Sequence, residues 1–391
     1  MDVAQNTPLC PDTTRSTEAY THGSGKRAAK APLQVLTGLR FVAASVVVAN
    51  HFWPISTSPH YGPFFLRGAV TAVTFFFVLS GFILTYVYAD TLDNLPILSG
   101  AKTFWHARFA RIAPVYYLSL LISLPPILYA VFVSRVSTFN ASVILTPLFL
   151  QAWWPNVSTS WNAPAWSLSA ECFFYLIFPF LIRFIKKIPD SALLLSTYIL
   201  VSVTALIVPP SMIPERFLNP SLFWMHFRAF FPLLHLPSFL FGVAVARAYS
   251  HYRKEPLKHA AALFWLAAAA LPLLLGLRGI LPAALSSNLT IVPLSGALIW
   301  LGSQLDGRKM LLSTPLMLLL GEASYALYIL HVPLLWWWKW LMTKCALTAW
   351  QSIPSAISLF ILVNMIAAIT FIWFETPVRR KILGHIENRM G

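Results

Sequence analysis

Long apolar runs recur along this chain from residue 33 to residue 374, and no interval between them has the composition of a soluble domain. Only 10% of the 391 residues are charged, whereas soluble domains carry about 25% charged residues. A helix of about 20 apolar residues crosses the hydrocarbon core of a bilayer, because it satisfies its own backbone hydrogen bonds there. The sequence therefore predicts an all-α fold, a polytopic bundle of membrane helices.

Ten of these runs are long enough to be predicted as transmembrane helices. The apolar run at 143–154 is too short to span, so we expect it to be re-entrant or interfacial. The predicted spans are 33–53, 70–89, 112–133, 170–186, 192–209, 229–248, 259–277, 287–303, 315–338 and 354–374.

Basic residues predict the orientation of these spans. With both termini cytoplasmic, the tails and the even-numbered loops hold 20 Lys and Arg residues, and the opposite loops hold 7. Cytoplasmic loops of membrane proteins carry such an excess, so we expect ten spans in a plasma or inner membrane. The formal charge of +15 lies at the ends of the apolar runs. This distribution argues against nucleic acid as a partner.

Composition divides the chain into three parts. Residues 1–32 are polar and are expected to form a disordered cytoplasmic tail. Residues 33–380 form the membrane domain, and residues 381–391 a short cytoplasmic tail. The run at 33–53 is too long for a signal peptide and has no small-residue cleavage site after it, so we expect it to remain as a helix. The three cysteines are far apart, and no metal site is expected.

Two polar residues in the first predicted span are costly in a bilayer and are therefore candidates for function. Arg40 and His51 are eleven residues apart, about 20° beyond three full helical turns, so they share one face. They are separated by about 16 Å along the axis, with Arg40 toward the cytoplasm. Snorkelling of Arg40 and a hydrogen-bonded core histidine at position 51 explain the pair about as well as catalysis does.

Arg108 and Arg111 lie three residues apart at the start of the third predicted span, on one helix face. Ordinary flanking cations would give this pattern. A site for a phosphate-bearing ligand would give it too, because the guanidinium fork matches phosphate oxygens.

Glu171 begins the fourth predicted span at its outer end and is the only acidic residue between Asp93 and Asp190. Its carboxylate could cap a helix or approach His51. The nearby Trp166 could stack on a sugar, although interfacial belts are the commoner reason for such tryptophans.

A polar seam lies near the middle of the ninth predicted span, where Tyr325, Tyr328 and His331 recur at every third position. Helix–helix hydrogen bonding explains it as well as catalysis does. Glu375, at the end of the last span, is expected to be a charged helix terminus.

Six segments in a fixed order along roughly 33–380 together resemble the acyltransferase 3 family of membrane O-acyltransferases. They are LTGLR at 36–40 with His51, FFFVLSGF at 75–82, RFARI at 108–112, WSLSAE at 166–171, SYALYILH at 324–331 and FETP at 374–377. Thr37 departs from the pattern, because an acidic residue is common there. Glu171 is the single acid where a pair is frequent. The chain ends sixteen residues after Glu375, so we expect it to lack the C-terminal Ser-hydrolase-like domain of some relatives.

The resemblance implies transfer of an acyl group, usually acetyl from acetyl-CoA, to a hydroxyl of a cell-surface or lipid-linked carbohydrate. Acyl-CoA would be a co-substrate, and no permanently bound cofactor is expected. Arg40, Arg108 and Arg111 would hold the CoA phosphates. His51 would be the general base, because imidazole titrates near neutral pH, and Glu171 would orient it or bind the acceptor.

The expected substrate-binding residues are Trp166, Tyr328 and His331. Membrane lipids are further expected partners, and a homodimer is allowed. Three alternatives remain at this point. O-acylation of a small molecule such as a macrolide uses the same chemistry, and a transporter or flippase of a glycan or acyl group also has buried charges. A non-catalytic membrane subunit is the third alternative, although the retained charged residues argue against it.

Overall fold

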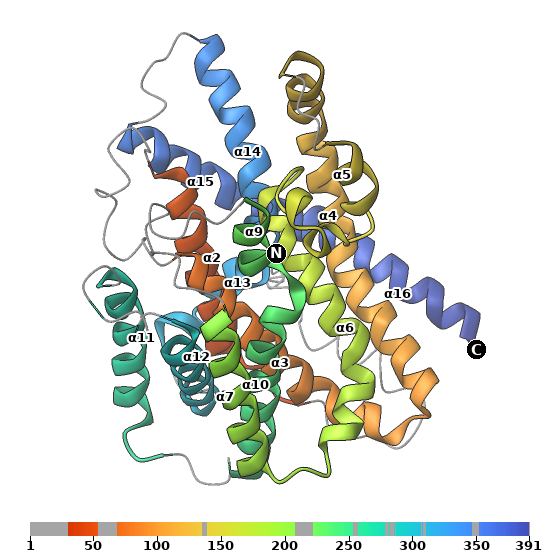
Figure 1. The fold of residues 1–391 in the computed structure, drawn as a ribbon, viewed down its shortest axis with the longest axis vertical. Coiled ribbons are helices and arrows are strands. Elements are labelled where there is room, and N and C mark those ends of the chain that lie inside the picture. The colour runs from red at the N-terminus through yellow and green to blue at the C-terminus, as the bar shows by residue number, and fades with distance from the viewer. Residues whose placement is uncertain are drawn as a thin grey trace, which may run out of the picture.

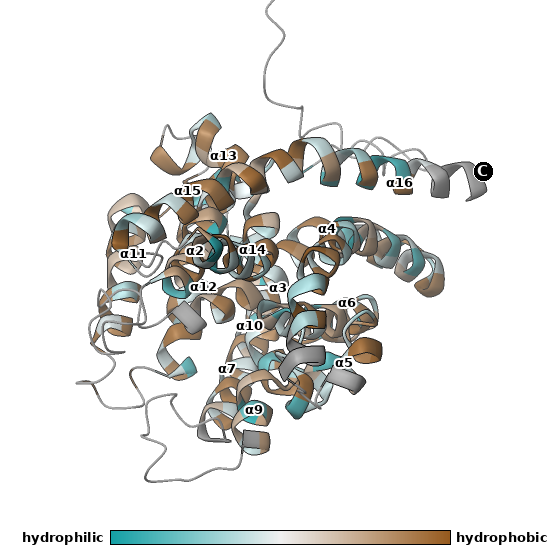
Figure 2. Ribbon diagram, turned by 90° about the horizontal axis from the view of Figure 1, so that it is seen from above, coloured by the Kyte–Doolittle hydropathy of each residue, from teal (hydrophilic) through white to brown (hydrophobic). Residues whose placement is uncertain are grey.

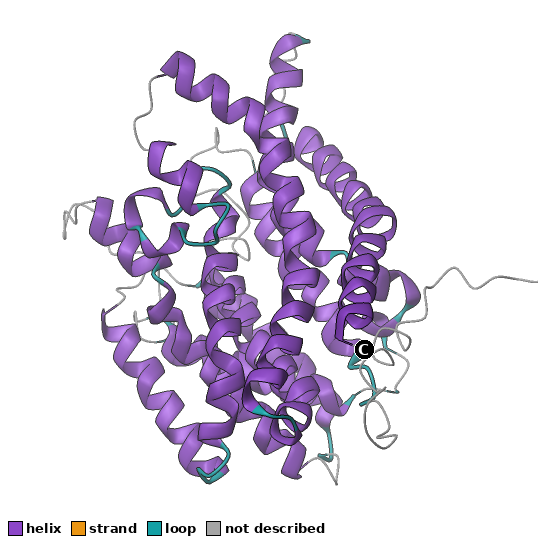
Figure 3. Cartoon of the chain, turned by 90° about the vertical axis from the view of Figure 1, so that its right-hand side faces the viewer, coloured by secondary structure: helices purple, strands orange, loops and turns teal. Residues whose placement is uncertain are grey.

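The computed structural model describes residues 30–53, 69–134, 139–207, 222–252, 257–277, 281, 285, 287–305, 307, 310–345 and 352–390. Within these ranges every regular element is a helix and there is no strand (Figure 3). The all-α fold class is confirmed.

Fourteen α-helices occur in the described ranges, joined by short 3-10 turns and one π turn (Figure 1). They are α2 (Gln34–Phe52), α3 (Ala69–Asn94), α4 (Ile97–Ser134), α5 (Phe139–Leu145), α6 (Trp166–Ile185), α7 (Asp190–Ile207), α9 (Leu222–Phe230), α10 (Pro232–Tyr252), α11 (Ala260–Gly276), α12 (Asn288–Gln304), α13 (Pro315–Glu322), α14 (Ser324–Lys344), α15 (Ile353–Thr370) and α16 (Thr376–Met390).

Six helices within the described residues are long and apolar enough to cross a membrane, and the chain is a membrane protein. A seventh span follows if α13 and α14, which meet at an angle of 58°, are counted as one. The helices at the other predicted spans, α7, α11 and α12, are shorter or less apolar. The count of ten and the orientation therefore remain predictions. Figure 2 shows that the bundle helices are mostly hydrophobic and that α16 projects from the bundle edge with hydrophilic residues.

Two helix starts differ from prediction in a way that moves site residues. The third predicted span begins at residue 112, whereas α4 begins at Ile97. Arg108 and Arg111 therefore lie about 16 and 21 Å along α4, at 1.5 Å per residue, instead of at its start. The fourth predicted span begins at residue 170, whereas α6 begins at Trp166, so Glu171 lies in its second turn.

The ninth predicted span is not one straight helix. It breaks at Ala323 between α13 and α14. The last predicted span ends in the π turn Phe371–Glu375, after which α16 begins. The short run at 143–154 forms the end of α5 and a 3-10 turn at Gln151–Trp153.

Of the two predicted tails, one is largely outside the described residues. Only Lys30, Ala31 and Pro32 of the tail at 1–32 are described. Residues 381–390 of the C-terminal tail continue α16.

Glycines let particular helices approach closely. A Cβ on Gly81 of α3 would lie 2.0 Å from the carbonyl oxygen of Phe239 in α10, and a Cβ on Gly242 of α10 would lie 1.9 Å from that of Val78 in α3. Small residues allow membrane helices to pack at this distance. A third close contact places Gly321 against the Thr37 carbonyl oxygen, where a Cβ would lie 2.2 Å away. That contact holds α13 against α2, the helix that carries Arg40 and His51.

The ends of α3, α6, α7 and α10 meet on one side of the bundle. Lys186, directly after α6, lies 2.6 Å from the Asp93 carboxylate of α3. Arg247 of α10 lies 2.9 Å from Asp190 at the start of α7. The basic-residue count predicts that all these helix ends lie on the cytoplasmic side. The meeting of α6 and α7 is visible at the lower end of Figure 1.

Candidate active site

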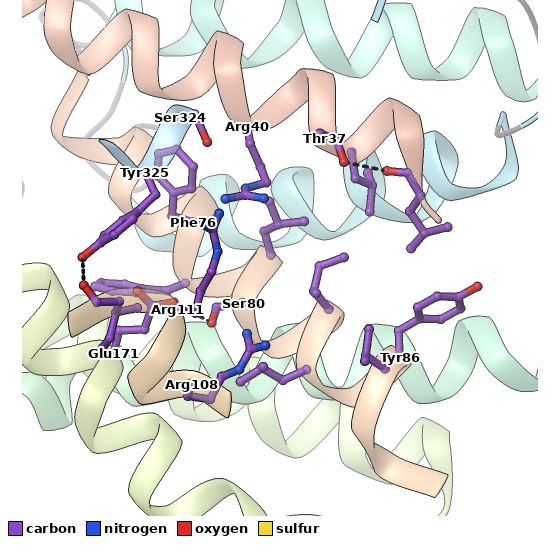
Figure 4. A pocket seen from close by; sticks show the side chains of 18 of the residues that line it. Thr37, Arg40, Phe76, Ser80, Tyr86, Arg108, Arg111, Glu171, Ser324 and Tyr325 are labelled. Atoms are coloured by element: carbon purple, nitrogen blue, oxygen red, sulfur yellow. Dashed lines mark hydrogen bonds between the residues drawn. The ribbon is translucent and has the colours of Figure 1, made fainter. Parts of the chain in front are cut away.

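A cavity of about 440 Å³ lies between α2, α3, α4, α6 and the bend that joins α13 to α14. Its walls are mostly apolar, and the charged side chains within it come from separate helices. Figure 4 shows Arg40 of α2 and Arg111 of α4 pointing toward each other, with Arg108 nearby. Glu171 and Tyr328 line the same cavity. Five of the eight predicted site residues are thus brought together.

Arg111 is held by several groups. Its guanidinium forms an ion pair with Glu375, whose side chain is 1% exposed. It also lies 3.9 Å from the Glu322 carboxylate and donates a hydrogen bond of 3.4 Å to the main-chain carbonyl of Glu322. The Tyr325 ring centroid is 5.7 Å away. The orientation of Arg111 is therefore fixed, and buried acidic charge compensates its own charge.

Glu375 differs from the expected exposed helix terminus. It ends the π turn Phe371–Glu375, in which the N–H of Thr376 donates to the carbonyl of Phe371. A π turn accommodates one residue more than an α-helical turn and is frequent at functional sites. The burial of Glu375 against Arg111 corrects the interpretation as a simple charged terminus. One signal could have found it, because Glu375 is the only acidic residue between Glu322 and Glu387 and stands in an apolar stretch.

Arg108 has aromatic partners. It donates a hydrogen bond of 2.8 Å to the Tyr88 hydroxyl, and its guanidinium lies 5.0 Å from the centroid of the same ring. The Tyr175 ring centroid is 6.0 Å away. Aromatic faces attract cations without neutralising them. These contacts hold Arg108 in the wall of the cavity.

Arg40 takes part in no salt bridge within the part of the chain that the structure describes. Its charge acts on Arg111 across the cavity. Lys30, which also lines the cavity, pairs with Asp90 at 2.9 Å. The cavity thus presents guanidinium groups whose charge exceeds that of its acidic lining, which suits an anionic ligand.

Glu171 belongs to the cavity. One of its carboxylate oxygens accepts hydrogen bonds from Ser80 at 3.0 Å and from Tyr175 at 2.5 Å. Among the described residues no hydrogen bond joins Glu171 to His51, and Glu171 lies in the cavity with the arginines. Its position suits it to act on a group bound beside the arginines.

The two site histidines lie outside the cavity and contact each other. The ring centroids of His51 and His331 are 4.8 Å apart, with the planes at 63°. His51 is exposed, whereas His331 is 0% exposed. Tyr328 lies 5.9 Å from His331, centroid to centroid, and also lines the cavity. Tyr328 is therefore the link between the arginine cavity and the histidine pair.

Trp166 lies in the core. Its side chain is 6% exposed and packs against the rings of Phe230 and His235, with centroids 5.0 and 5.1 Å away. Trp166 does not line the cavity, and no exposed face is available for stacking on a sugar. Its neighbour Ser167 does line the cavity, and the Ser167 hydroxyl lies 2.9 Å from the Tyr328 hydroxyl.

Sequence reasoning missed the residues that position the arginines and Glu171. Ser80 is the single hydroxyl in the run FFFVLSGF, which was the available signal. The hydrogen-bonding roles of Tyr88 and Tyr175 depend on which helices are neighbours. No pattern along the chain contains that information.

These features define the class of protein as a polytopic membrane protein with an arginine-lined cavity and, between α2 and α14, a histidine pair. The chain belongs to the acyltransferase domain family (acyltransferase 3), whose sequence profile matches residues 33–373. The family resemblance carried by the six segments is thereby confirmed.

Two curated relatives are similar to parts of the chain. Acyltransferase MdmB of Streptomyces mycarofaciens is 34% identical over 167 residues, which are 40% of this chain and 41% of the relative. Peptidoglycan O-acetyltransferase OatA of Listeria monocytogenes is 30% identical over 180 residues, which are 42% of this chain and 26% of the relative. The matches therefore span less than half the length of either relative. No solved structure matches significantly.

Proposed function

We propose that this protein is a membrane O-acyltransferase that moves an acyl group, acetyl in the simplest case, from acyl-CoA to a hydroxyl of a cell-surface or lipid-linked carbohydrate. One observation carries the proposal. Arg40, Arg108 and Arg111 converge on one cavity, and the helix that carries Arg40 also carries His51. Family membership favours this enzyme over the transporter alternative.

The donor is proposed to bind at the arginine cavity. CoA carries phosphates, and the forked donors of a guanidinium group match phosphate oxygens. Arg40 has no acidic partner among the described residues that would compete with these phosphates. The apolar walls contributed by α2 and α3 suit the pantetheine arm. From Arg40 the arm would run along α2 past Tyr328 for about 16 Å, at 1.5 Å of rise per residue, to His51.

The chemistry is proposed to occur at His51. The imidazole Nε2 takes the proton of the acceptor hydroxyl while the hydroxyl oxygen attacks the thioester carbonyl carbon. The C–S bond of the donor then breaks, and the leaving thiolate takes the same proton back from His51. The products are an O-acyl ester and CoA–SH, and His51 returns to its starting state.

The acceptor is proposed to be a carbohydrate because the name of one relative, from Listeria monocytogenes, states peptidoglycan O-acetylation. A small-molecule acceptor such as a macrolide uses the same proton transfer and remains the alternative. Purified protein in nanodiscs should acetylate a carbohydrate acceptor and leave a macrolide unmodified. Mass spectrometry of both after incubation with acetyl-CoA distinguishes them.

The donor site is tested by comparing acetyl-CoA with acetyl-pantetheine, which has the thioester and no phosphates. We expect Arg40→Ala to raise the KM for acetyl-CoA by about 10-fold or more, as loss of a charge-assisted contact does, and to leave the KM for acetyl-pantetheine unchanged. Arg380→Ala, on the exposed part of α16, is the matched control. An equal loss for both donors would remove Arg40 from phosphate recognition.

A further inference from the structure

The hydrogen bonds of the histidine pair fix which ring nitrogen carries a proton. His51 Nδ1 lies 2.8 Å from the carbonyl oxygen of Val47, and His331 Nδ1 lies 2.5 Å from that of Tyr328. A carbonyl oxygen only accepts, so both Nδ1 atoms must donate. In the neutral rings both Nε2 atoms are then unprotonated and carry a lone pair.

The two Nε2 atoms differ in their surroundings. His51 is exposed, so its Nε2 can meet a substrate. The Nε2 of His331 is buried and has no hydrogen-bond partner among the described residues. A buried acceptor without a donor costs free energy, and native structures rarely retain one without a functional reason.

The surroundings of His331 indicate what can satisfy this acceptor. Its described ring contacts are with His51 at 4.8 Å, Tyr328 at 5.9 Å and Phe52 at 6.2 Å, centroid to centroid. Tyr328 of α14 and His51 of α2 are the titratable side chains among them. The Tyr328 hydroxyl already lies within hydrogen-bonding distance of Ser167 and Pro164. His51 is the one neighbour whose charge changes in the proposed reaction.

We propose that His331 is a positioning residue whose Nε2 stabilises the positive charge that His51 gains when it takes the proton of the acceptor hydroxyl. The proposal rests on the proposed function of His51. The proton bound at His51 is the one that later leaves with the CoA thiolate, and His331 itself stays neutral. Its lone pair faces no donor among the described residues and interacts favourably with His51 when that ring is an imidazolium. Such an interaction lowers the barrier without tightening substrate binding.

Two substitutions distinguish the roles of the two ring nitrogens of His331. In His331→Gln the amide oxygen replaces Nε2 as an acceptor. In His331→Asn the amide replaces Nδ1 and can keep the hydrogen bond to the Tyr328 carbonyl. We expect His331→Asn to lower kcat by about 10–100-fold, because Asn removes the acceptor beside the charged His51 ring, with the KM for acetyl-CoA unchanged. His331→Gln should retain kcat within about threefold, because its amide oxygen keeps an acceptor beside His51.

The reverse order would overturn the proposal. If His331→Asn stayed active and His331→Gln lost activity, the hydrogen bond to the Tyr328 carbonyl would be the only role of His331. Wild-type kcat in both variants would overturn it as well. If both variants lose activity, thermal unfolding and acetyl-CoA binding show whether they are folded. Equal loss in folded proteins removes the specific role of Nε2.

A second measurement does not depend on catalysis. In ¹⁵N-histidine-labelled protein in nanodiscs, the His331 Nε2 resonance should shift as His51 is protonated, and the shift should be absent in His51→Gln. No response in the wild type would overturn the pairing. Wild-type protein that shows this coupling and transfers no acyl group would overturn the proposed function and leave the pairing intact.

Discussion

Helix α2 contributes Arg40 to the arginine cavity and His51 to the histidine pair, and the polar groups of the two sites are satisfied in opposite ways. At the cavity, Arg111 is held by Glu375 and Glu322, and Glu171 accepts two hydrogen bonds. At the histidine pair, the buried Nε2 of His331 has no partner among the described residues. A site that is preorganised before a ligand arrives supports binding. A site that becomes satisfied only when charge develops supports the chemical step.

The largest expected effect tests this division directly. His51→Ala should lower kcat by about 10²–10⁴-fold, the range for loss of a general base, and should leave the Kd for acetyl-CoA unchanged. Initial rates and equilibrium binding measure the two quantities. His106→Ala, an exposed histidine of α4, is the control. Near-normal turnover in His51→Ala would show that His51 is not the general base and would favour the cavity as the place of the reaction.

A smaller effect is expected at the arginine cavity, from a change at Glu375. Glu375→Gln leaves the guanidinium of Arg111 buried without its main counter-charge, and such a loss typically costs about 3–5 kcal/mol of stability. The KM for acetyl-CoA should rise as Arg111 shifts, and kcat at saturating donor should change little. Thermal unfolding in detergent and steady-state kinetics measure both effects.

Glu322→Gln is the matched control for Glu375→Gln. Its side chain is 29% exposed and lies 3.9 Å from the same guanidinium. We expect a smaller loss of stability than for Glu375→Gln, because this pair is longer and Glu322 is partly solvated. Equal destabilisation by the two substitutions would show that Glu375 does not hold Arg111 preferentially.

The smallest effect is expected at an exposed ion pair, which serves as the reference for the arginine cavity and the histidine pair. Lys186→Met breaks the pair with Asp93, whose side chains are 51% and 46% exposed. Stability should change by less than about 1 kcal/mol, because solvent screens exposed pairs, and neither kcat nor KM should move. A change in kcat would reveal coupling between the helix ends and the histidine pair.

Apolar periodicity predicted most helices and placed Arg40, Arg108 and Arg111 toward one side. It failed where a helix continues through polar sequence. The stretch before residue 112 contains four basic or titratable side chains, Lys102, His106, Arg108 and Arg111, and hydropathy therefore hides the first part of α4. Because α4 and α6 both begin earlier than predicted, the arginines and Glu171 both lie deeper in their helices than expected. They line the same cavity.

Other parts of the site were beyond sequence reasoning for a different reason. The Arg111–Glu375 pair joins positions 264 residues apart. The contact between His51 and His331 joins positions 280 apart. Local patterns determine which face of a helix is polar, but they do not determine which faces of distant helices meet. The bend at Ala323 and the π turn decide those meetings.

The π turn at Phe371–Glu375 has a consequence for comparing relatives. Exposed apolar residues recur at every fourth position along α15, at Ile357, Ile361, Met365 and Ile369. Trp373, four residues after Ile369, continues that exposed stripe. The additional residue of the π turn shifts the helical phase by about 100° and sets Glu375 inward. A relative that lacks one residue in this segment would therefore place a different side chain against Arg111. Alignment of this segment by matched columns alone would pair residues that occupy different faces of the helix.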